Sequence, residues 1–355
     1  MTRPDDAPAS RRSRPRSRTR SRARDRGGLL LALAALAGTG IALPGTAQAG
    51  RAAPFRAADT GARITAETRL GPNEVDITID SPSLGKAVKT RILLPRDWQA
   101  GSTAKWPVLY AYHGGQDDYT SWPRNTDIEG WAAAYNAIVV MPEAADGAYT
   151  DWYNYGFGGT PKWETFHTQE VVQLIERNYH ASTTRAAIGD SAGGNGAIAY
   201  AARFPGMFTH VASLSGVLWL RAPGMPSLIM ATNALNGQDP FAIYGLVFLN
   251  AANWRAHDPY ELAPRLRGTK IFFSAGTTGR PGPGDDPDQP PWAVGLFSEK
   301  AVGDTNVAFR DRMDDLGIPY TAHLYGDGQH DWPAWIPVAT RVWPDLMASI
   351  GARRL

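Results

Sequence analysis

Short apolar segments alternate with longer helix-like segments from about residue 74 to the C-terminus. The short segments are rich in Val, Ile and aromatic residues, which is typical of strands buried on both faces of a mostly parallel sheet. They cover residues 74–79, 89–94, 108–112, 137–141, 185–188, 210–214, 270–273 and 320–325. Helices are expected at residues 164–179, 192–203, 306–316 and 335–350. This alternation predicts one α/β domain, with a mostly parallel central sheet flanked by helices on both faces.

Two segments interrupt the alternation. Residues 217–253 are long, apolar and helix-like, a pattern that fits a cap over an active site and ordinary core helices equally well. Residues 276–291 are rich in Gly, Pro and Asp, so we expect them to form a loop. Long surface loops that follow a strand often carry residues of a functional site.

The N-terminal segment has the three parts of a secretory signal peptide. Ten arginines lie within residues 1–27, an apolar run covers 29–43, and the small-residue triplet Ala47-Gln48-Ala49 follows. Glycines interrupt the apolar run, which is shorter than the roughly 20 residues of a membrane-spanning helix. A cleaved signal is therefore favoured over a membrane anchor. A twin-arginine pair at Arg11-Arg12 lies far ahead of the apolar run, which favours the general export route over the twin-arginine one.

These features divide the chain into a signal peptide over 1–49, a linker over 50–70 and a folded domain over 71–355. The mature protein is expected to be secreted or associated with the cell wall, without a membrane span. Ten of the 36 basic and three of the 34 acidic residues lie in the leader, which leaves 26 and 31 and a net charge of −5. A mildly acidic protein without a basic cluster does not suit nucleic-acid binding. The absence of cysteine excludes disulfides, a thiol nucleophile and Cys-ligated zinc.

The segment Gly189-Asp190-Ser191-Ala192-Gly193 matches the G-x-S-x-G pattern of a nucleophile elbow. It follows a predicted strand and precedes a predicted helix of small residues, which is the context that such an elbow requires. Glycines two before and two after the serine are needed because side chains there would collide with the strand and helix. Ser191 is therefore the candidate nucleophile. The backbone N–H of Ala192, at the helix start, is a candidate oxyanion donor.

A serine nucleophile needs a base, and His330 is the best placed of the seven histidines. It follows the last predicted strand, and only His323 lies comparably late in the chain, inside that strand. The acid should lie between serine and histidine, after the strand at 270–273. Four carboxylates fit this position, and spacing does not choose among them: Asp285, Asp286, Asp288 and Glu299.

The second oxyanion donor should come from the loop after the strand at 108–112, which reads His113-Gly114-Gly115. Glycines allow a backbone N–H to approach a ligand closely, and the N–H of Gly115 is the predicted donor. His113 is a predicted substrate contact, as are Trp332 and Trp335, which follow the base and would line an apolar acyl pocket. This set of residues works without a metal or cofactor, so none is expected.

Five motifs together resemble one known family, the antigen 85 mycolyltransferases of the wider esterase D-like group of esterases. They recur there in the same order, and here they lie at residues 116–119, 151–153, 162–166, 187–191 and 330–332. The resemblance runs from about residue 74 to the C-terminus. It implies an α/β-hydrolase fold, a Ser–Glu–His triad and an acyl-enzyme intermediate. In the family the acid lies seven residues before an Asn that opens a helix, which implies Glu299 here, seven before Asn306.

Departures from this family concern the acceptor of the acyl group. Members that load mycolic acid onto trehalose carry an arginine just before Gln-Asp-Asp-Tyr, whereas here Gly115 runs directly into Gln116. An Asp of that loop is replaced by His113, and a cysteine pair before Lys-Trp-Glu-Thr-Phe is absent. These differences argue against trehalose as the acceptor. Hormone-sensitive-lipase-like esterases also share Gly-Asp-Ser-Ala-Gly-Gly and a His-Gly-Gly loop, but the spacing of the other motifs favours the first family.

The sequence therefore predicts a secreted serine carboxylic-ester hydrolase that acts on an ester or acyl lipid through an acyl-enzyme. An acyltransferase that uses a sugar or glycerolipid acceptor is the alternative within this chemistry. A catalytically silent carbohydrate- or wall-binding protein is the alternative outside it, since the chain's 12 tryptophans would suit sugar stacking. The complete set of serine, acid and histidine favours the enzyme. The sequence gives no oligomeric state.

Overall fold

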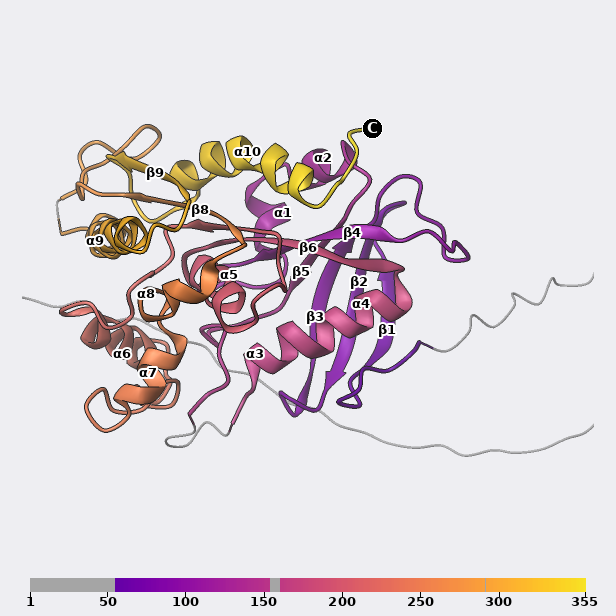
Figure 1. The fold of residues 1–355 in the computed structure, drawn as a ribbon, viewed down its shortest axis with the longest axis horizontal. Coiled ribbons are helices and arrows are strands. Elements are labelled where there is room, and N and C mark those ends of the chain that lie inside the picture. The colour runs from indigo at the N-terminus through magenta and orange to yellow at the C-terminus, as the bar shows by residue number, and fades with distance from the viewer. Residues whose placement is uncertain (1–54, 154–159, 291) are drawn as a thin grey trace, which may run out of the picture. The chain divides into compact units, whose positions relative to one another are not determined.

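The computed structural model describes residues 55–153, 160–290 and 292–355. They contain a nine-stranded sheet with the strand order β1-β2-β3-β5-β4-β6-β7-β8-β9 (Figure 1). The strands are β1 Arg63–Arg69, β2 Glu74–Ser81, β3 Lys86–Leu93, β4 Trp106–Tyr112, β5 Ile138–Pro142, β6 Ala181–Asp190, β7 His210–Leu214, β8 Lys270–Gly276 and β9 Thr321–Gly326.

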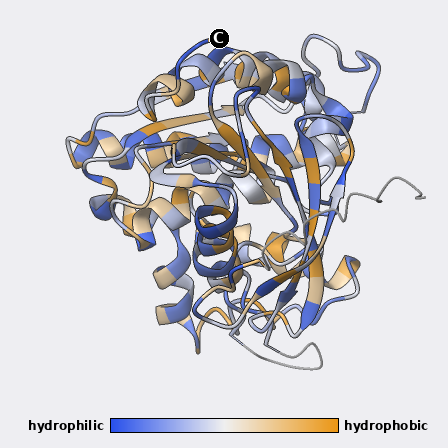
Figure 2. Cartoon of the chain, turned by 90° about the vertical axis from the view of Figure 1, so that its right-hand side faces the viewer, coloured by the Kyte–Doolittle hydropathy of each residue, from blue (hydrophilic) through white to orange (hydrophobic). Residues whose placement is uncertain are grey.

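The sheet is antiparallel at one end and parallel over the rest. β1, β2, β3 and β5 pair antiparallel, whereas β5, β4, β6, β7, β8 and β9 pair in parallel. Every residue of β5 and β7 is buried, and β4, β6 and β8 are buried over most of their length. Figure 2 shows the apolar residues concentrated along these strands. The predicted mostly parallel sheet of the α/β-hydrolase fold is confirmed.

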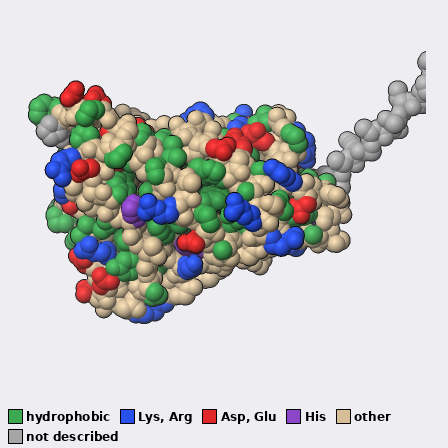
Figure 3. All heavy atoms as spheres, turned by 90° about the horizontal axis from the view of Figure 1, so that it is seen from above, with side chains coloured by type: hydrophobic (Ala, Val, Ile, Leu, Met, Phe, Trp, Pro, Cys, Tyr) green, Lys and Arg blue, Asp and Glu red, His purple; other side chains and the backbone are tan. Residues whose placement is uncertain are grey.

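Helices cover both faces of the sheet, as predicted. α4, α5 and α9 pack into one hydrophobic cluster and α1, α2 and α10 into another, below and above the sheet in Figure 1. Their bounds are α1 Ser121–Asn125, α2 Ile128–Ala133, α3 Trp163–Thr165, η1 Phe166–Val171, α4 Val172–Asn178, α5 Ser191–Arg203, α6 Met225–Leu235, α7 Ala251–His257, α8 Pro259–Leu262, η2 Ala263–Leu266, α9 Val294–Asp315 and α10 Trp332–Ser349. The segment η1 is a π-helical turn between α3 and α4. Figure 3 shows acidic and basic side chains interspersed over the face seen from above.

The structure differs from the sequence-based expectation at two places. Within the expected linker over 50–70, Arg63–Arg69 form strand β1, whose side chains are almost all exposed, so the sequence carries no hydrophobic signal for it. Helix α9 begins at Val294, well before residue 306, because the preceding loop and the glycines in its first turns hide its start. The predicted signal peptide over 1–49 lies outside the described residues.

Of residues 217–253, only Leu218 belongs to one of the two main clusters. Helix α6 buries only Met225 and Asn233. A small separate cluster contains Leu220, Ile243, Tyr244 and Trp254. This packing favours an added outer segment over core helices. Within the described residues, none of the helices has the length and apolar character that crossing a membrane requires.

Candidate active site

Ser191 lies in a sharp turn between β6 and α5. Its φ is 48°, in the left-handed region that non-glycine residues rarely adopt. The flanking residues must be glycines because other backbone atoms lie very close to their Cα atoms. A Cβ on Gly189 would lie 2.3 Å from the carbonyl carbon of Gly193, and one on Gly193 would lie 2.4 Å from the carbonyl oxygen of Tyr112. Such strain is retained where surrounding packing enforces it, and here it presents the serine hydroxyl at the end of the sheet.

Three predicted residues meet at this turn. His330 Nε2 lies 2.7 Å from Ser191 Oγ, and His330 Nδ1 lies 2.7 Å from Glu299 Oε2. The histidine lies in the loop between β9 and α10, where its backbone N–H donates to the carbonyl of Gly295 at 3.0 Å. Glu299 lies on α9 and has no exposed surface. In this arrangement the histidine can take the serine proton while the carboxylate orients the ring.

Both oxygens of the buried Glu299 carboxylate have hydrogen-bond partners. Its Oε1 accepts hydrogen bonds from the Ser215 hydroxyl at 2.7 Å, the Tyr325 hydroxyl at 2.7 Å and the Gly276 N–H at 2.6 Å. Three donors on one oxygen offset the cost of burying the charge and leave Oε2 for His330. Neither Ser215 nor Tyr325 has a signal in the sequence, because both contacts depend on how β7, β9 and α9 are brought together.

The alternative acids do not reach the histidine. Asp285 Oδ2 accepts the N–H groups of Gly282 and Gln329, at 2.8 and 2.9 Å, and so holds the loop that precedes His330. Asp286 accepts the N–H of Asp288 at 3.0 Å in an exposed turn. Of the candidate acids, Glu299 is the one that the fold places beside His330.

Asn306 does not open a helix, as the resemblance had implied, but lies within α9. Its side-chain Nδ2 donates to the carbonyl of Gly216 at 2.8 Å. It therefore ties the helix that carries Glu299 to the turn after β7.

The loop after β4 runs against the nucleophile. A Cβ on Gly114 would lie 2.6 Å from Asp190 Oδ2 and 3.3 Å from the Ser191 Cβ. The N–H of Gly115 donates to no other residue that the structure describes. Ala192 lies in the first turn of α5, where N–H groups lack intrahelical acceptors. Both N–H groups are thus available to an oxyanion.

Two predicted substrate contacts, His113 and Trp335, are buried in the structure. His113 is 1% exposed, its Nδ1 lies 2.6 Å from the carbonyl oxygen of Gly114, and its Nε2 accepts the N–H of Ala144 at 2.9 Å. Trp335 is also buried; its indole N–H donates to Ser215 at 3.0 Å and its ring meets that of His330 edge-on at 5.1 Å. Both side chains therefore help to hold residues around the catalytic serine and histidine in place.

The third predicted contact, Trp332, keeps part of its surface exposed. Its ring packs edge-on against Trp122 at 5.1 Å between centroids. It stays a predicted substrate contact.

Asp190, next to the nucleophile, is a buried acid that the sequence did not single out. Burial raises its pKa to about 7, against the lowering effect of nearby His113 and His330. Its Oδ1 has no hydrogen-bond partner among the described residues. The charge of this carboxyl group therefore changes near neutral pH, directly beneath Gly114.

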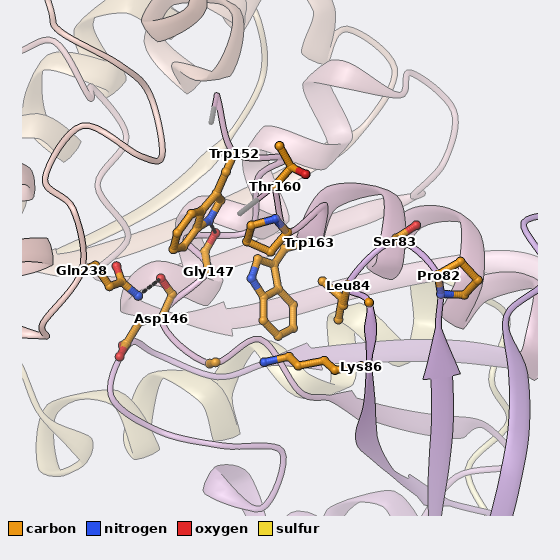
Figure 4. A pocket seen from close by; sticks show the side chains of 13 residues that line it. Pro82, Ser83, Leu84, Lys86, Asp146, Gly147, Trp152, Thr160, Trp163 and Gln238 are labelled. Carbon is orange, nitrogen blue, oxygen red and sulfur yellow. Dashed lines mark hydrogen bonds between the residues drawn. The ribbon is translucent and has the colours of Figure 1, made fainter. Parts of the chain in front are cut away.

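A cavity of about 460 Å³ is lined in part by the segment after β5, at residues 145–147, but Ser191, Glu299 and His330 do not line it. Figure 4 shows Trp152, Trp163 and Lys86 around it, with Asp146 and Gln238 joined by a hydrogen bond on one side. In the described part of the chain, no cluster of three His, Asp or Glu side chains is arranged to hold a metal ion.

Comparison with known proteins agrees with this fold. The family model described as "Putative esterase" matches residues 81–342. Esterase Rv1288 of Mycobacterium tuberculosis is 31% identical over 301 residues, which cover 80% of this chain and 62% of that protein. The chain thus spans less than two thirds of this relative's length.

A second relative and a solved structure bear on the resemblance. The diacylglycerol acyltransferase/mycolyltransferase Ag85B of Mycobacterium intracellulare is 29% identical, with coverage of 78% of this chain and 83% of that protein. The crystal structure of Mycobacterium tuberculosis MPT51 superposes with a TM-score of 0.63 at 22% identity, with coverage of 76% and 96%. The resemblance to the antigen 85 proteins is confirmed, and the chain belongs to the "Putative esterase" family with an α/β-hydrolase fold.

Proposed function

We propose that this protein is a secreted serine esterase that cleaves carboxylic esters through an acyl-enzyme. The observation that carries the proposal is the pair of 2.7 Å contacts linking Ser191, His330 and Glu299. Its family membership supports ester chemistry in general, and the arrangement of these side chains supports the serine route.

In the first half of the reaction, Ser191 Oγ attacks the ester carbonyl as its proton passes to His330 Nε2. Glu299 holds the Nδ1–H tautomer of the histidine and stabilises the imidazolium that forms. The N–H groups of Gly115 and Ala192 bind the oxyanion. The tetrahedral intermediate collapses, the C–O bond to the alcohol breaks, and His330 returns the proton to the leaving alcohol.

In the second half, water or another alcohol attacks the acyl carbon as its proton passes to His330, the bond to Ser191 Oγ breaks, and His330 returns the proton to the serine. Transfer to a sugar or glycerolipid is the second candidate function, since relatives such as Ag85B are named acyltransferases. The direct junction of Gly115 and Gln116, which lacks the arginine of trehalose-using family members, favours water. The substrate is accordingly an ester or acyl lipid, and the reaction needs no metal or cofactor.

A fluorophosphonate probe tests the serine mechanism. Wild-type protein should be labelled, whereas Ser191→Ala should not be labelled and should lose roughly 10⁴–10⁶-fold in kcat. An unlabelled wild-type protein that binds wall polysaccharide would instead support the silent binding protein. N-terminal sequencing of exported protein tests the signal peptide: the mature chain should begin near Gly50, and a protein that retains Met1 would contradict secretion by cleavage.

A further inference from the structure

The segment that follows β5 is strained. Ala145, Ala148 and Tyr149 all have positive φ, at 44°, 51° and 53°. Each such residue costs about 1 kcal/mol or more and persists only where its surroundings hold it. Close packing supplies that restraint, because a Cβ on Gly147 would lie 2.2 Å from the Trp163 ring. The conformation of residues 144–149 is therefore imposed by the fold.

This strained segment holds the loop 113–116 at both ends. At the first end, the Tyr149 hydroxyl donates to the His113 carbonyl at 2.7 Å and the Ala144 N–H donates to His113 Nε2 at 2.9 Å. At the second end, Asp146 Oδ1 accepts the N–H of Gln116 at 2.7 Å. The two glycines lie between these fixed ends.

The second contact determines the orientation of the predicted oxyanion donor. Gln116 has a φ of 60°, and its N–H is engaged by Asp146. A Cβ built on Gly115 would lie 3.6 Å from Asp146 Oδ1, which places the carboxylate directly against this residue. With the next N–H engaged by Asp146, the N–H of Gly115, an exposed residue, is left for a ligand.

We propose that Asp146 is a positioning residue for the oxyanion hole: by binding the N–H of Gln116, it keeps the N–H of Gly115 directed at the substrate carbonyl. The inference rests on the proposed serine mechanism. Asp146 is itself fixed from the other side, because its carbonyl accepts a hydrogen bond from Gln238 at 3.1 Å (Figure 4). A charged acceptor for a backbone N–H gives a stronger contact than a neutral one.

The test compares Asp146→Ala with Asp146→Asn in the full-length exported protein. Removing an oxyanion donor costs roughly 10²–10³-fold in kcat, and a misdirected donor should lose part of this. We expect about a 10–50-fold fall in kcat for the alanine variant, with KM changed less than about threefold. The asparagine variant keeps an acceptor oxygen and should stay within about threefold of wild type.

A transition-state analogue separates positioning from general damage. A trifluoromethyl ketone forms a hemiketal with the serine whose oxyanion occupies the oxyanion hole, so its affinity should fall by the same factor as kcat. The matched control is Asp239→Ala, because Asp239 is equally half-buried and accepts a backbone N–H, that of Phe241 at 2.9 Å. This control should retain wild-type kcat and analogue affinity.

Three results would overturn the proposal: wild-type kcat in Asp146→Ala, unchanged analogue affinity alongside a lower kcat, or an equal loss in Asp239→Ala. If the alanine variant does not fold, Asp146→Glu replaces it, since the longer side chain moves the carboxylate; wild-type kcat there would also overturn the proposal. Failure of the wild type to react with fluorophosphonate would instead remove the serine mechanism, so the two failures are distinct.

Discussion

Replacing Tyr325 by phenylalanine removes one of the hydroxyl donors that contact the buried acid. The hydroxyl donates to Glu299 Oε1 at 2.7 Å, and the Ser215 hydroxyl and Gly276 N–H remain on the same oxygen. Phenylalanine fills the same ring volume, so no cavity forms beneath the site. The variant therefore removes one short hydrogen bond to the carboxylate, together with a longer contact of 3.3 Å between the Tyr325 and Ser215 hydroxyls.

The magnitude follows from the charge and burial of that carboxylate. A hydrogen bond to a charged group contributes about 1.5–3 kcal/mol, and we take the lower part of this range because two donors remain. The loss falls on the transition state, where the carboxylate must stabilise an imidazolium. At 1.4 kcal/mol per factor of ten, a loss of about 1.5–2 kcal/mol lowers kcat by roughly 10–30-fold.

The assay is steady-state hydrolysis of a short p-nitrophenyl ester, with active sites counted by fluorophosphonate labelling. Tyr320→Phe is the matched control, since this tyrosine donates to Asp314 at 2.8 Å near the start of β9, away from the triad. The control should keep wild-type kcat, and both variants should keep the melting temperature within a few degrees. A kcat for Tyr325→Phe within twofold of wild type would refute the role given to the donors on Oε1.

Three further predictions concern the loop, the pH dependence of stability and the acceptor. Gly114→Ala should lower kcat at least tenfold, because its Cβ would lie 2.6 Å from Asp190 Oδ2, whereas Gly101→Ala, with open space around it, should not; equal activities would contradict the loop geometry. Burial and, to a smaller extent, the positive charge of Lys270 lower the pKa of His210 to about 4. Between pH 6.5 and 4 the unfolded chain therefore binds a proton at this residue that the folded chain does not bind. The contribution of this residue to the free energy of unfolding is complete above pH 6.5 and is lost as the pH falls toward 4. Urea unfolding should show that His210→Gln loses about 3 kcal/mol less stability than wild type between these pH values. Parallel curves of unfolding free energy against pH for the two proteins would disprove this. With one ester donor and millimolar trehalose, free acid should exceed acylated trehalose in the products; the reverse ratio would replace hydrolase by transferase.

The sequence predicts correctly those features that depend only on residues close together along the chain. The G-x-S-x-G turn needs only its neighbours along the chain, and the fold places Ser191 in a strained turn as the motif implies. The buried strands were equally clear because both of their faces are apolar. β1 was not, because an edge strand with exposed side chains lacks the alternation on which such a prediction depends.

Residues that act through distant contacts had no such signal. Ser215, Tyr325 and Asp146 come from separate loops and strands, and only the assembled sheet brings them to the triad and the loop 113–116. The engagement of His113 had no sequence signal either: the residue was predicted to contact substrate, and in the structure both of its ring nitrogens contact backbone groups.

The π-helical turn η1 constrains the number of residues in this region as well as their identity. It joins two stretches with separate partners: Thr165, which binds Asp151 through its N–H at 2.9 Å and its hydroxyl at 2.6 Å, and the core residues Leu174 and Ile175 of α4. A π turn contains one residue more than an α turn needs. Deleting one residue there would close the π turn to an α turn and keep the two stretches in register, whereas adding one more would rotate one stretch against the other by about 100°, given 3.6 residues per helical turn. Over evolutionary time, this helix should therefore accept the loss of one residue more readily than the gain of one.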